Sequence, residues 1–345
     1  MSSLQYVFIF FVFSSCFGQT KEKYRIPIPE ASKDITADNF VDRVVSQIKH
    51  YDKEAMYFIR PLQNNCVYEL LINDFPVYKD YGIEKLATPI NINRAILQSG
   101  PQTVTVRLYP LGDALKRAYG DGETITKLLP KSEMKVKVVK YEAFNISDEL
   151  EDEIVVKEHT SPTKEGSEEF EGAGLPYYEY TFTFDAEVPY KNEGWLNGED
   201  LTKFDKKELE NQVLKYYNEY IQISENKLLD RVLSINFLSE VRRRKSQYHD
   251  KKYVEDILLE FKKETIEHKK SFQPLENYTL SFYGNNRIVC LKFPSKEPVK
   301  RQYRGKSAVW YKYKNEPNGP TRGRWLDLYL YLPTGQSLGS LQMIP

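Results

Sequence analysis

The chain has 345 residues, of which 41% are hydrophobic and 14% are aromatic. This length allows a large buried core, arranged as two domains or as one large domain. Lys and Arg together number 49, as do Asp and Glu, so no net charge attracts the protein to nucleic acid or to an anionic membrane. We therefore expect no nucleic acid among its partners.

Residues 1–18 have the pattern of a secretory signal peptide. The uncharged apolar run Tyr6–Phe13 is followed by small residues and by a cleavage position before Gln19. The run is too short to span a membrane, so no transmembrane segment is expected after cleavage. The sequence predicts export to the periplasm, the cell surface or the medium. Acylation of Cys16 would give a lipoprotein form, and a buried N-terminal strand is the alternative to a signal.

Two further cysteines, Cys66 and Cys290, lie far apart in the sequence, each within an apolar run typical of a strand. In an oxidising compartment they could form a disulfide, or each could be a small buried hydrophobic residue. The sequence leaves both alternatives open. Two cysteines are too few for a small fold held together by disulfides.

The first half of the mature chain is predicted to be mainly β. Residues 19–54 read as an extended lead-in with a short amphipathic helix over 38–50. Period-two alternation then dominates residues 55–195 and is clearest over Tyr178–Val188. Alternation of this kind buries one face of a strand and exposes the other, as in an antiparallel β-sandwich. Residues 158–174, rich in Glu, Gly, Ser and Thr, are expected to form a loop.

The second half, residues 200–345, is predicted to be an α+β domain. Apolar residues recur with helical spacing over 205–272, where Asp205 and Glu208 resemble a capping box. Strands are expected over 278–344. The predicted fold class is therefore mostly β with α+β, namely an N-terminal antiparallel β-sandwich followed by a helical segment packed on a C-terminal antiparallel sheet.

Residues 72–106 resemble the core of galactose-binding-like β-sandwiches, the modules attached to many secreted glycosidases. The counterparts of that core are Ile72–Val77, Ile90–Asn93 and Ile96–Val106, with Asn73 in a tight hairpin. Asp74 and Gln102 depart from the usual Gly and Asn. The resemblance implies a fold and no ligand contacts. More loosely, the whole chain resembles uncharacterised exported bacterial proteins of Bacteroidetes type, some of which are suspected immunity proteins.

No catalytic residue, cofactor site or metal site is predicted. The four histidines lack the spacing of metal ligands, and no nucleophile motif or phosphate-binding glycine loop is present. The acidic run Glu149–Glu153 lacks the alternating spacing of a calcium loop and is expected to be a solvated turn. The densest basic run, Arg242–Lys245, is expected to be a solvated helix end.

Aromatic and arginine side chains gather near the C-terminus, and such side chains can clamp an anionic, peptide or sugar ligand. The candidate binding surface consists of Tyr311, Tyr313, Arg322, Arg324 and Trp325. Strand alternation places Tyr311 and Tyr313 on one face and Trp310 on the other, so part of this cluster must be core.

These observations favour an exported, non-enzymatic protein that binds another protein, with an immunity-type protein as one form. The alternative is a protein that binds carbohydrate or assists in polysaccharide handling. An enzyme whose catalytic carboxylates cannot be recognised in one sequence is a third hypothesis.

Overall fold

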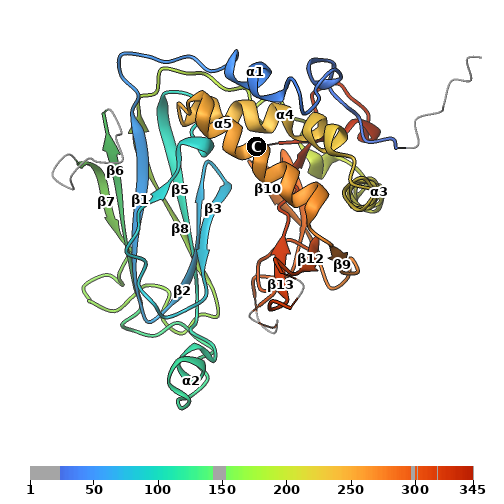
Figure 1. Ribbon diagram of the computed structural model, residues 1–345. Coiled ribbons are helices and arrows are strands. Elements are labelled where there is room, and N and C mark those ends of the chain that lie inside the picture. The colour runs from blue at the N-terminus through green and yellow to red at the C-terminus, as the bar shows by residue number, and fades with distance from the viewer. Residues whose placement is uncertain (1–23, 143–152, 297–299, 301, 317, 345) are drawn as a thin grey trace, which may run out of the picture.

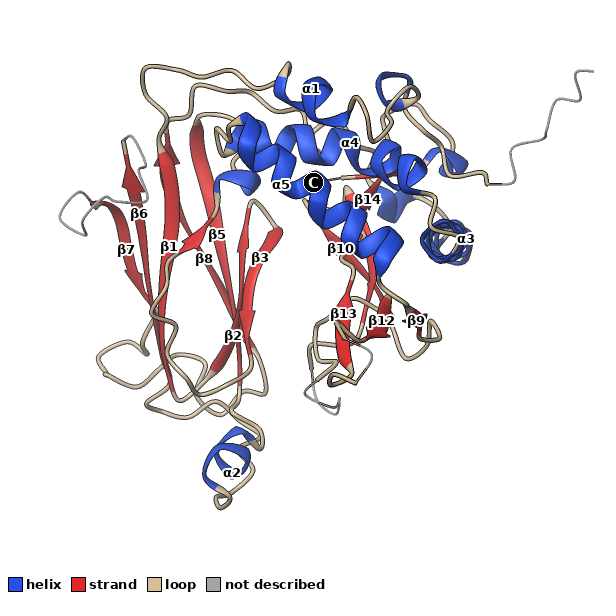
Figure 2. Cartoon of the chain, in the orientation of Figure 1, coloured by secondary structure: helices blue, strands red, loops and turns tan. Residues whose placement is uncertain are grey.

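The computed structural model describes residues 24–142, 153–296, 300, 302–316 and 318–344. A β-sandwich lies on the left in Figures 1 and 2, smaller sheets lie on the right, and helices cover the upper end of both. The predicted signal peptide, Cys16 and most of the acidic run Glu149–Glu153 fall outside the described residues. The prediction of a mostly β, α+β fold with antiparallel sheets is confirmed.

Two four-stranded antiparallel sheets form the sandwich. One sheet has the order β4-β1-β6-β7, with β1 (Met56–Asn64), β4 (Ile90–Asn91), β6 (Glu133–Tyr141) and β7 (Ile154–Thr160). The other has the order β3-β2-β5-β8, with β2 (Val67–Ile72), β3 (Phe75–Asp80), β5 (Gly100–Tyr109) and β8 (Tyr178–Ala186). Burial alternates along β8 from Glu179 onward, as its sequence pattern predicts.

Asn73 and Asp74 form the tight turn between β2 and β3. Their φ angles are 52° and 58°, and Ile72 pairs directly with Phe75 across the turn. Two successive positive φ angles match the twist of a two-residue hairpin, and Asn and Asp tolerate them better than most residues. The hairpin expected at Asn73 is therefore present.

The helical part follows the sandwich and packs on the C-terminal strands. Its helices are α3 (Lys206–Glu225), α4 (Leu229–Ser246) and α5 (Lys251–Lys262), continued by the π-helical turn η5 (Lys263–Glu267). Asp205 caps α3, since its side chain accepts a hydrogen bond from the Glu208 amide. Shorter helices lie elsewhere, namely α1 (Phe40–Val45), α2 (Ala114–Tyr119) and the 3₁₀ turns η1 (Glu30–Ser32), η2 (Asn93–Ala95), η4 (Leu201–Lys203) and η6 (Leu338–Ser340).

Two small antiparallel sheets complete the chain. The first has the order β10-β11-β14-β15, with β10 (Thr279–Tyr283), β11 (Ile288–Lys292), β14 (Leu330–Tyr331) and β15 (Gln342–Met343). The second has the order β13-β12-β9, with β9 (Ser271–Phe272), β12 (Trp310–Tyr313) and β13 (Arg322–Trp325).

The hydrophobic core of the sandwich extends into the C-terminal sheets, where Tyr283, Ile288 and Tyr329 join it. The turn between β10 and β11 contacts the β2–β3 hairpin, where the amides of Gly284 and Asn285 donate to Asp74. Phe75, just after the hairpin, stacks on Trp195 at 5.0 Å and lies 5.2 Å from Tyr329, measured between ring centroids. These contacts hold strand β3 beside the C-terminal part of the chain.

Two predicted segments differ from the structure. Residues 271–272, placed in the predicted helical stretch 205–272, form strand β9, because π-helix η5 ends at Glu267 and the chain turns to pair with β12. The loop predicted from residue 158 begins later, because β7 extends to Thr160 by pairing with β6. Among the described helices, none combines the length and the apolar character needed to cross a membrane.

Candidate functional site: a charged cavity between the sandwich and the C-terminal sheets

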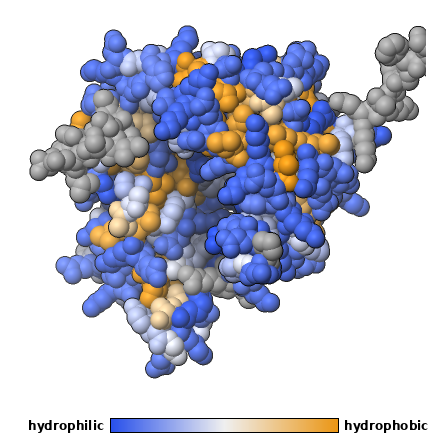
Figure 3. All heavy atoms as spheres, viewed as in Figure 1, coloured by the Kyte–Doolittle hydropathy of each residue, from blue (hydrophilic) through white to orange (hydrophobic). Residues whose placement is uncertain are grey.

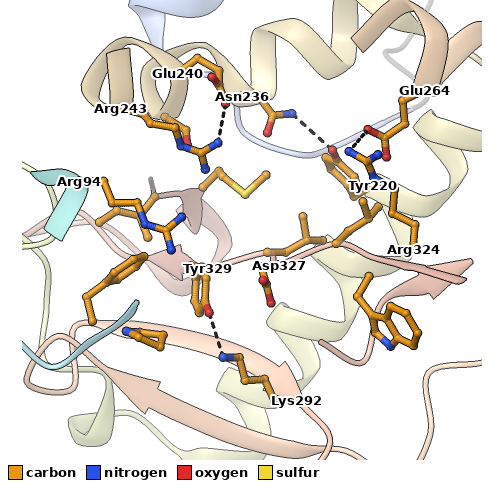
Figure 4. Close-up of a pocket in the computed structure, with 18 of the residues that line it drawn as sticks. Arg94, Tyr220, Asn236, Glu240, Arg243, Glu264, Lys292, Arg324, Asp327 and Tyr329 are labelled. Atoms are coloured by element: carbon orange, nitrogen blue, oxygen red, sulfur yellow. Dashed lines mark hydrogen bonds and ion pairs between the residues drawn. The ribbon is translucent and has the colours of Figure 1, made fainter. Parts of the chain in front are cut away.

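A cavity of about 460 Å³ lies where the sandwich, the helices and the C-terminal strands meet. Its walls come from β3, from helix α4 with η5, and from the segment around residues 324–329 (Figure 4). The volume is within the usual range for small-ligand pockets, which is roughly 300–1,000 Å³. The visible face around it is mainly hydrophilic, with apolar patches over the helices (Figure 3). We call this space the central cavity.

The central cavity carries more positive than negative side chains. Six cations line it, namely Lys79, Arg94, Arg243, Lys270, Lys292 and Arg324. Four carboxylates line it, namely Glu69, Glu240, Glu264 and Asp327. A partly buried charge is stable only when a group of opposite charge lies close to it. The pairing of each carboxylate therefore determines which cations lack a partner.

Three of the carboxylates already have partners. Glu240 forms a buried ion pair with Arg244 at 2.5 Å and a looser one with Arg243 at 3.4 Å. Glu264 accepts from the Tyr311 hydroxyl at 2.6 Å and pairs with Arg324 at 3.0 Å.

Glu69 is the third of these carboxylates. It accepts hydrogen bonds from the hydroxyls of Tyr81, Tyr109 and Ser295. It lies 4.0 Å from Arg107, which is more closely paired with Glu179 at 2.6 Å.

Several of the cations have no carboxylate within ion-pair distance. In the described part of the chain, Arg94 makes no ion pair and no hydrogen bond, and its guanidinium lies 5.8 Å from the Phe75 ring centroid. Lys292 is buried and donates to the Tyr329 hydroxyl at 2.9 Å, and Lys79 donates to the Gly305 carbonyl oxygen. The cations at the Arg94 end and at the Lys79–Lys292 end of the cavity therefore have no ion-pair partner among the described residues.

This surplus of positive charge affects the ionisation of the groups themselves. Burial, followed by the charge of Lys292, lowers the pKa of Lys79 to about 8. Burial, followed by the charge of Arg243, also lowers the pKa of Arg94. Both shifts have the direction expected when a cation is partly removed from water and placed near another cation.

Arg94 is held in place by its neighbour Asn93, which is fully buried. The Asn93 side chain accepts from the Tyr57 amide at 2.6 Å and donates to the carbonyl oxygens of Ala55 and Ser246, each at 3.0 Å. Ser246 ends helix α4, which also carries Arg243. The two arginines are thus fixed relative to each other, although they are far apart in the sequence.

A second, outer pocket of about 450 Å³ shares Lys79, Arg324, Trp325 and Asp327 with the central cavity. Trp325 and Trp310 stack here at 5.5 Å with nearly parallel rings, and Lys306 lies 3.7 Å from the Trp325 ring centroid. Gly323 makes this packing feasible, because a Cβ at that position would lie 3.0 Å from the Trp325 ring.

The candidate surface predicted from the sequence is divided between core and surface. Tyr311 is 0% exposed, so it cannot contact a partner, and its prediction as a surface residue is corrected here. Its ring is covered by η5, whose Glu264 accepts its hydroxyl. Arg322 and Arg324 are exposed, and Trp325 is half-buried at the cavity wall. Tyr313 is half-buried and stacks on His268 at 4.7 Å.

The basic run Arg242–Lys245 is not simply a solvated helix end. Arg244 has only 4% of its side chain exposed and pairs with Glu240, and Arg243 lines the central cavity. No sequence pattern indicated Arg94, Lys79 or Lys292 as site residues. Lys79 and Lys292 stand at strand ends beside apolar residues, a position that is also common for solvated lysines, so the pattern alone does not distinguish them.

The described residues offer no group of three or more His, Cys, Asp or Glu side chains placed to hold a metal ion. Glu153, the described end of the acidic run, pairs with Arg60 at 2.6 Å. Cys66 and Cys290 are both buried free thiols, and burial raises the pKa of each to about 12. The chemistry that the site offers is the binding of negatively charged groups.

Comparisons of the chain with protein-family models, curated proteins and solved structures find no match.

Proposed function

We propose that this chain is an exported, non-enzymatic binding protein that recognises another protein, and that an acidic, extended segment of this partner lies between strands β3 and β13. An immunity-type protein that neutralises a toxin is one form that this proposal includes. The observation that carries the proposal is that the edges of two strands from different sheets border the same cavity.

The lining of the cavity indicates that these are strand edges and not strand faces. Arg324 and Trp325 at the end of β13 line the central cavity, as do residues 326–329, which follow that strand. Five consecutive residues of β3, Phe75–Lys79, also line it. Successive side chains of a strand point to opposite faces, so a run of this kind borders a cavity only along its edge. Within the described residues, β3 and β13 are the outer strands of their sheets.

Unpaired strand edges are a common means of binding an extended peptide. The peptide adds a strand through main-chain hydrogen bonds, and flanking side chains decide which sequence is accepted. Here the flanking side chains are basic, since Arg322 and Arg324 lie on one face of β13 and Lys79 ends the lining run of β3. A partner segment with acidic side chains at alternate positions would complement them.

The test compares wild-type protein with the double variant Arg322→Glu/Arg324→Gln as baits in a quantitative pull-down from the source organism. The matched control is Lys206→Glu/Lys215→Gln, which makes the same charge changes at exposed positions of α3. We expect one stoichiometric protein with wild type and with the control variant, and its loss with the β13 variant. Titration of the purified partner should then give a Kd that rises with salt concentration.

A partner retained equally by all three baits, or no stoichiometric protein with any of them, would contradict the proposal. Retention of wild-type protein on a polysaccharide column, without a protein partner, would replace it with the carbohydrate alternative. The Trp310–Trp325 stack and the Lys306 contact already occupy aromatic surface that a sugar ring would need. For this reason the protein partner is favoured.

A further inference from the structure

The inner end of the central cavity holds two arginines that are not fully compensated by carboxylates. Arg94 comes from η2 of the sandwich, and Arg243 comes from α4. Figure 4 shows both guanidinium groups on the same side of the cavity, reaching it from different elements. Arg94 and Arg243 lack a complete counter-charge for two different structural reasons.

Among the described residues, Arg94 has no carboxylate within ion-pair distance. It makes neither an ion pair nor a hydrogen bond with a described residue, and its guanidinium lies over the face of Phe75, 5.8 Å from the ring centroid. Arg94 is half-buried, and partial removal of a guanidinium from water without an ion-pair partner is unfavourable. An uncharged side chain of similar length could also pack on Phe75, so packing does not account for the positive charge at position 94.

Arg243 has only a share of one carboxylate. Glu240 binds Arg244 through two nitrogens, at 2.5 and 2.9 Å, and it reaches Arg243 only at 3.4 Å. The Nε atom of Arg243 is buried and has no hydrogen-bond partner among the described residues. The three arginines therefore exceed the single carboxylate on this side of the cavity.

We propose that Arg94 and Arg243 together bind the oxyanion group, a carboxylate or a phosphate, of a small solute that enters the central cavity. Guanidinium groups present planar forks of N–H donors that match both oxyanions. The Asn93 hydrogen bonds to Ala55 and Ser246 hold the two arginines in position before the ligand arrives. Such preorganisation reduces the entropy lost on binding.

The rest of the solute is expected to carry hydrogen-bond donors. Asp327 points into the middle of the cavity in Figure 4 and has no ion pair or hydrogen bond within the described chain. Its carboxylate can accept from a hydroxyl or ammonium group of the ligand. A cavity of about 460 Å³ accommodates a molecule of the size of a sugar phosphate, a hydroxy acid or an amino acid.

This site does not depend on the proposed protein partner. It lies at the Arg94–Arg243 end, whereas the partner is proposed to pair with the edges of β3 and β13. A small anion can therefore bind even if no protein does, and the two proposals can fail separately.

The experiment is calorimetric titration of the full-length mature protein, from Gln19, with inorganic phosphate and separately with citrate, at an ionic strength held constant with NaCl. Wild type is compared with Arg94→Met and with the control variant Lys215→Gln, which removes an exposed cation on α3. We expect saturable binding of at least one anion by wild type and by the control. In Arg94→Met the Kd should rise by about 10- to 100-fold, as the loss of a charge-assisted hydrogen bond predicts.

Binding of phosphate only, or of citrate only, supports the site and identifies the preferred oxyanion. The absence of saturable binding of both anions by wild type overturns the proposal. Equal weakening in Arg94→Met and Lys215→Gln also overturns it, because this result would indicate nonspecific attraction of anions. If Arg94→Met fails to fold, Arg243→Gln gives the same comparison, since that side chain is 33% exposed and its substitution is better tolerated.

Discussion

Asn93 Nδ2 donates a hydrogen bond of 3.0 Å to the carbonyl oxygen of Ser246, 153 residues further along the chain. This bond joins the β-sandwich to the end of helix α4, and thereby joins the two elements that carry Arg94 and Arg243. The side chain of Asn93 is fully buried, so its polar atoms depend on these protein partners and not on water.

Substitution Asn93→Ala should lower the free energy of unfolding by about 3 kcal/mol, because it leaves the Tyr57 amide and two carbonyl oxygens buried without partners. Urea denaturation followed by circular dichroism measures the change. The control is Asn218→Ala on α3, where an exposed amide bonds only to the Leu214 carbonyl oxygen. Equal effects of the two substitutions would show that Asn93 does not hold the junction together.

Substitution Glu240→Gln should destabilise the protein by about 3 kcal/mol, because it leaves the buried guanidinium of Arg244 without its counter-charge. Thermal and urea unfolding measure this loss. The matched control is Glu169→Gln in the exposed pair with Lys164, where the expected change is below about 1 kcal/mol. A small effect at Glu240 would mean that water reaches the Arg244 pair.

Glycine substitutions test the contact between the sandwich and the C-terminal part. Gly284 and Gly335 both have positive φ angles, of 60° and 78°, but a Cβ on Gly284 would lie 2.6 Å from the Trp195 ring while that on Gly335 meets nothing within 4 Å. Gly335→Ala should cost about 1 kcal/mol of backbone strain. Gly284→Ala should cost about 2 kcal/mol more, because the indole must move. Similar unfolding midpoints for the two variants would contradict this packing.

The ionisation of Lys79 should make stability depend on pH in the alkaline range. Its pKa is lowered to about 8 in the folded protein by burial and by Lys292, against the opposing influence of Asp327, Glu69 and Cys290. Between pH 8 and the ordinary lysine pKa of about 10.4, the unfolded chain binds more protons, so stability contributed through this group rises with pH.

The free energy of unfolding of Lys79→Met minus that of wild type should therefore decrease as the pH rises from 7 to 9.5. Loss of the hydrogen bond to the Gly305 carbonyl oxygen lowers the stability of the variant by an amount that does not depend on pH. The measurement is the free energy of unfolding of both proteins across this range. A difference that does not change with pH would show that Lys79 titrates normally.

Cys66 and Cys290 should not react with a thiol reagent in the folded protein. Both are buried, and burial raises the pKa of each thiol to about 12, so little reactive thiolate forms near neutral pH. Protein expressed from Gln19 should release both thiols to the reagent only in urea. Detection of no thiol after unfolding without reductant would show a disulfide instead.

Local sequence patterns were sufficient for the elements whose burial repeats along the chain. Alternation over Tyr178–Val188 predicted strand β8, the spacing of apolar residues after Asp205 predicted α3, and Asn73 predicted a hairpin. These signals lie within one element, because a strand or helix buries one face with a fixed period. Strand β9 was not predicted, because a strand of two residues is too short to show an alternating pattern. It forms by pairing with β12.

The site could be predicted only in part. Arg322, Arg324 and Trp325 were identified in the sequence because arginine and aromatic residues gather near the C-terminus, and Arg324 and Trp325 line the cavity. Arg94 stands in a turn segment with no pattern of its own. Arg94 packs on Phe75 and lies near Arg243 of helix α4, which is far from it in the sequence.

The sequence by itself therefore determined the fold class, the alternation of the strands and the balance of charge over the whole chain. The tertiary structure alone decided which cations are left without a counter-charge, because pairing depends on distances between side chains from different elements. Glu240 is bound by Arg244 one helical turn away, whereas Arg94 reaches the same cavity from the sandwich and has no described carboxylate within ion-pair distance. Composition gives the number of charged side chains, whereas tertiary packing determines which of them lie close enough to pair.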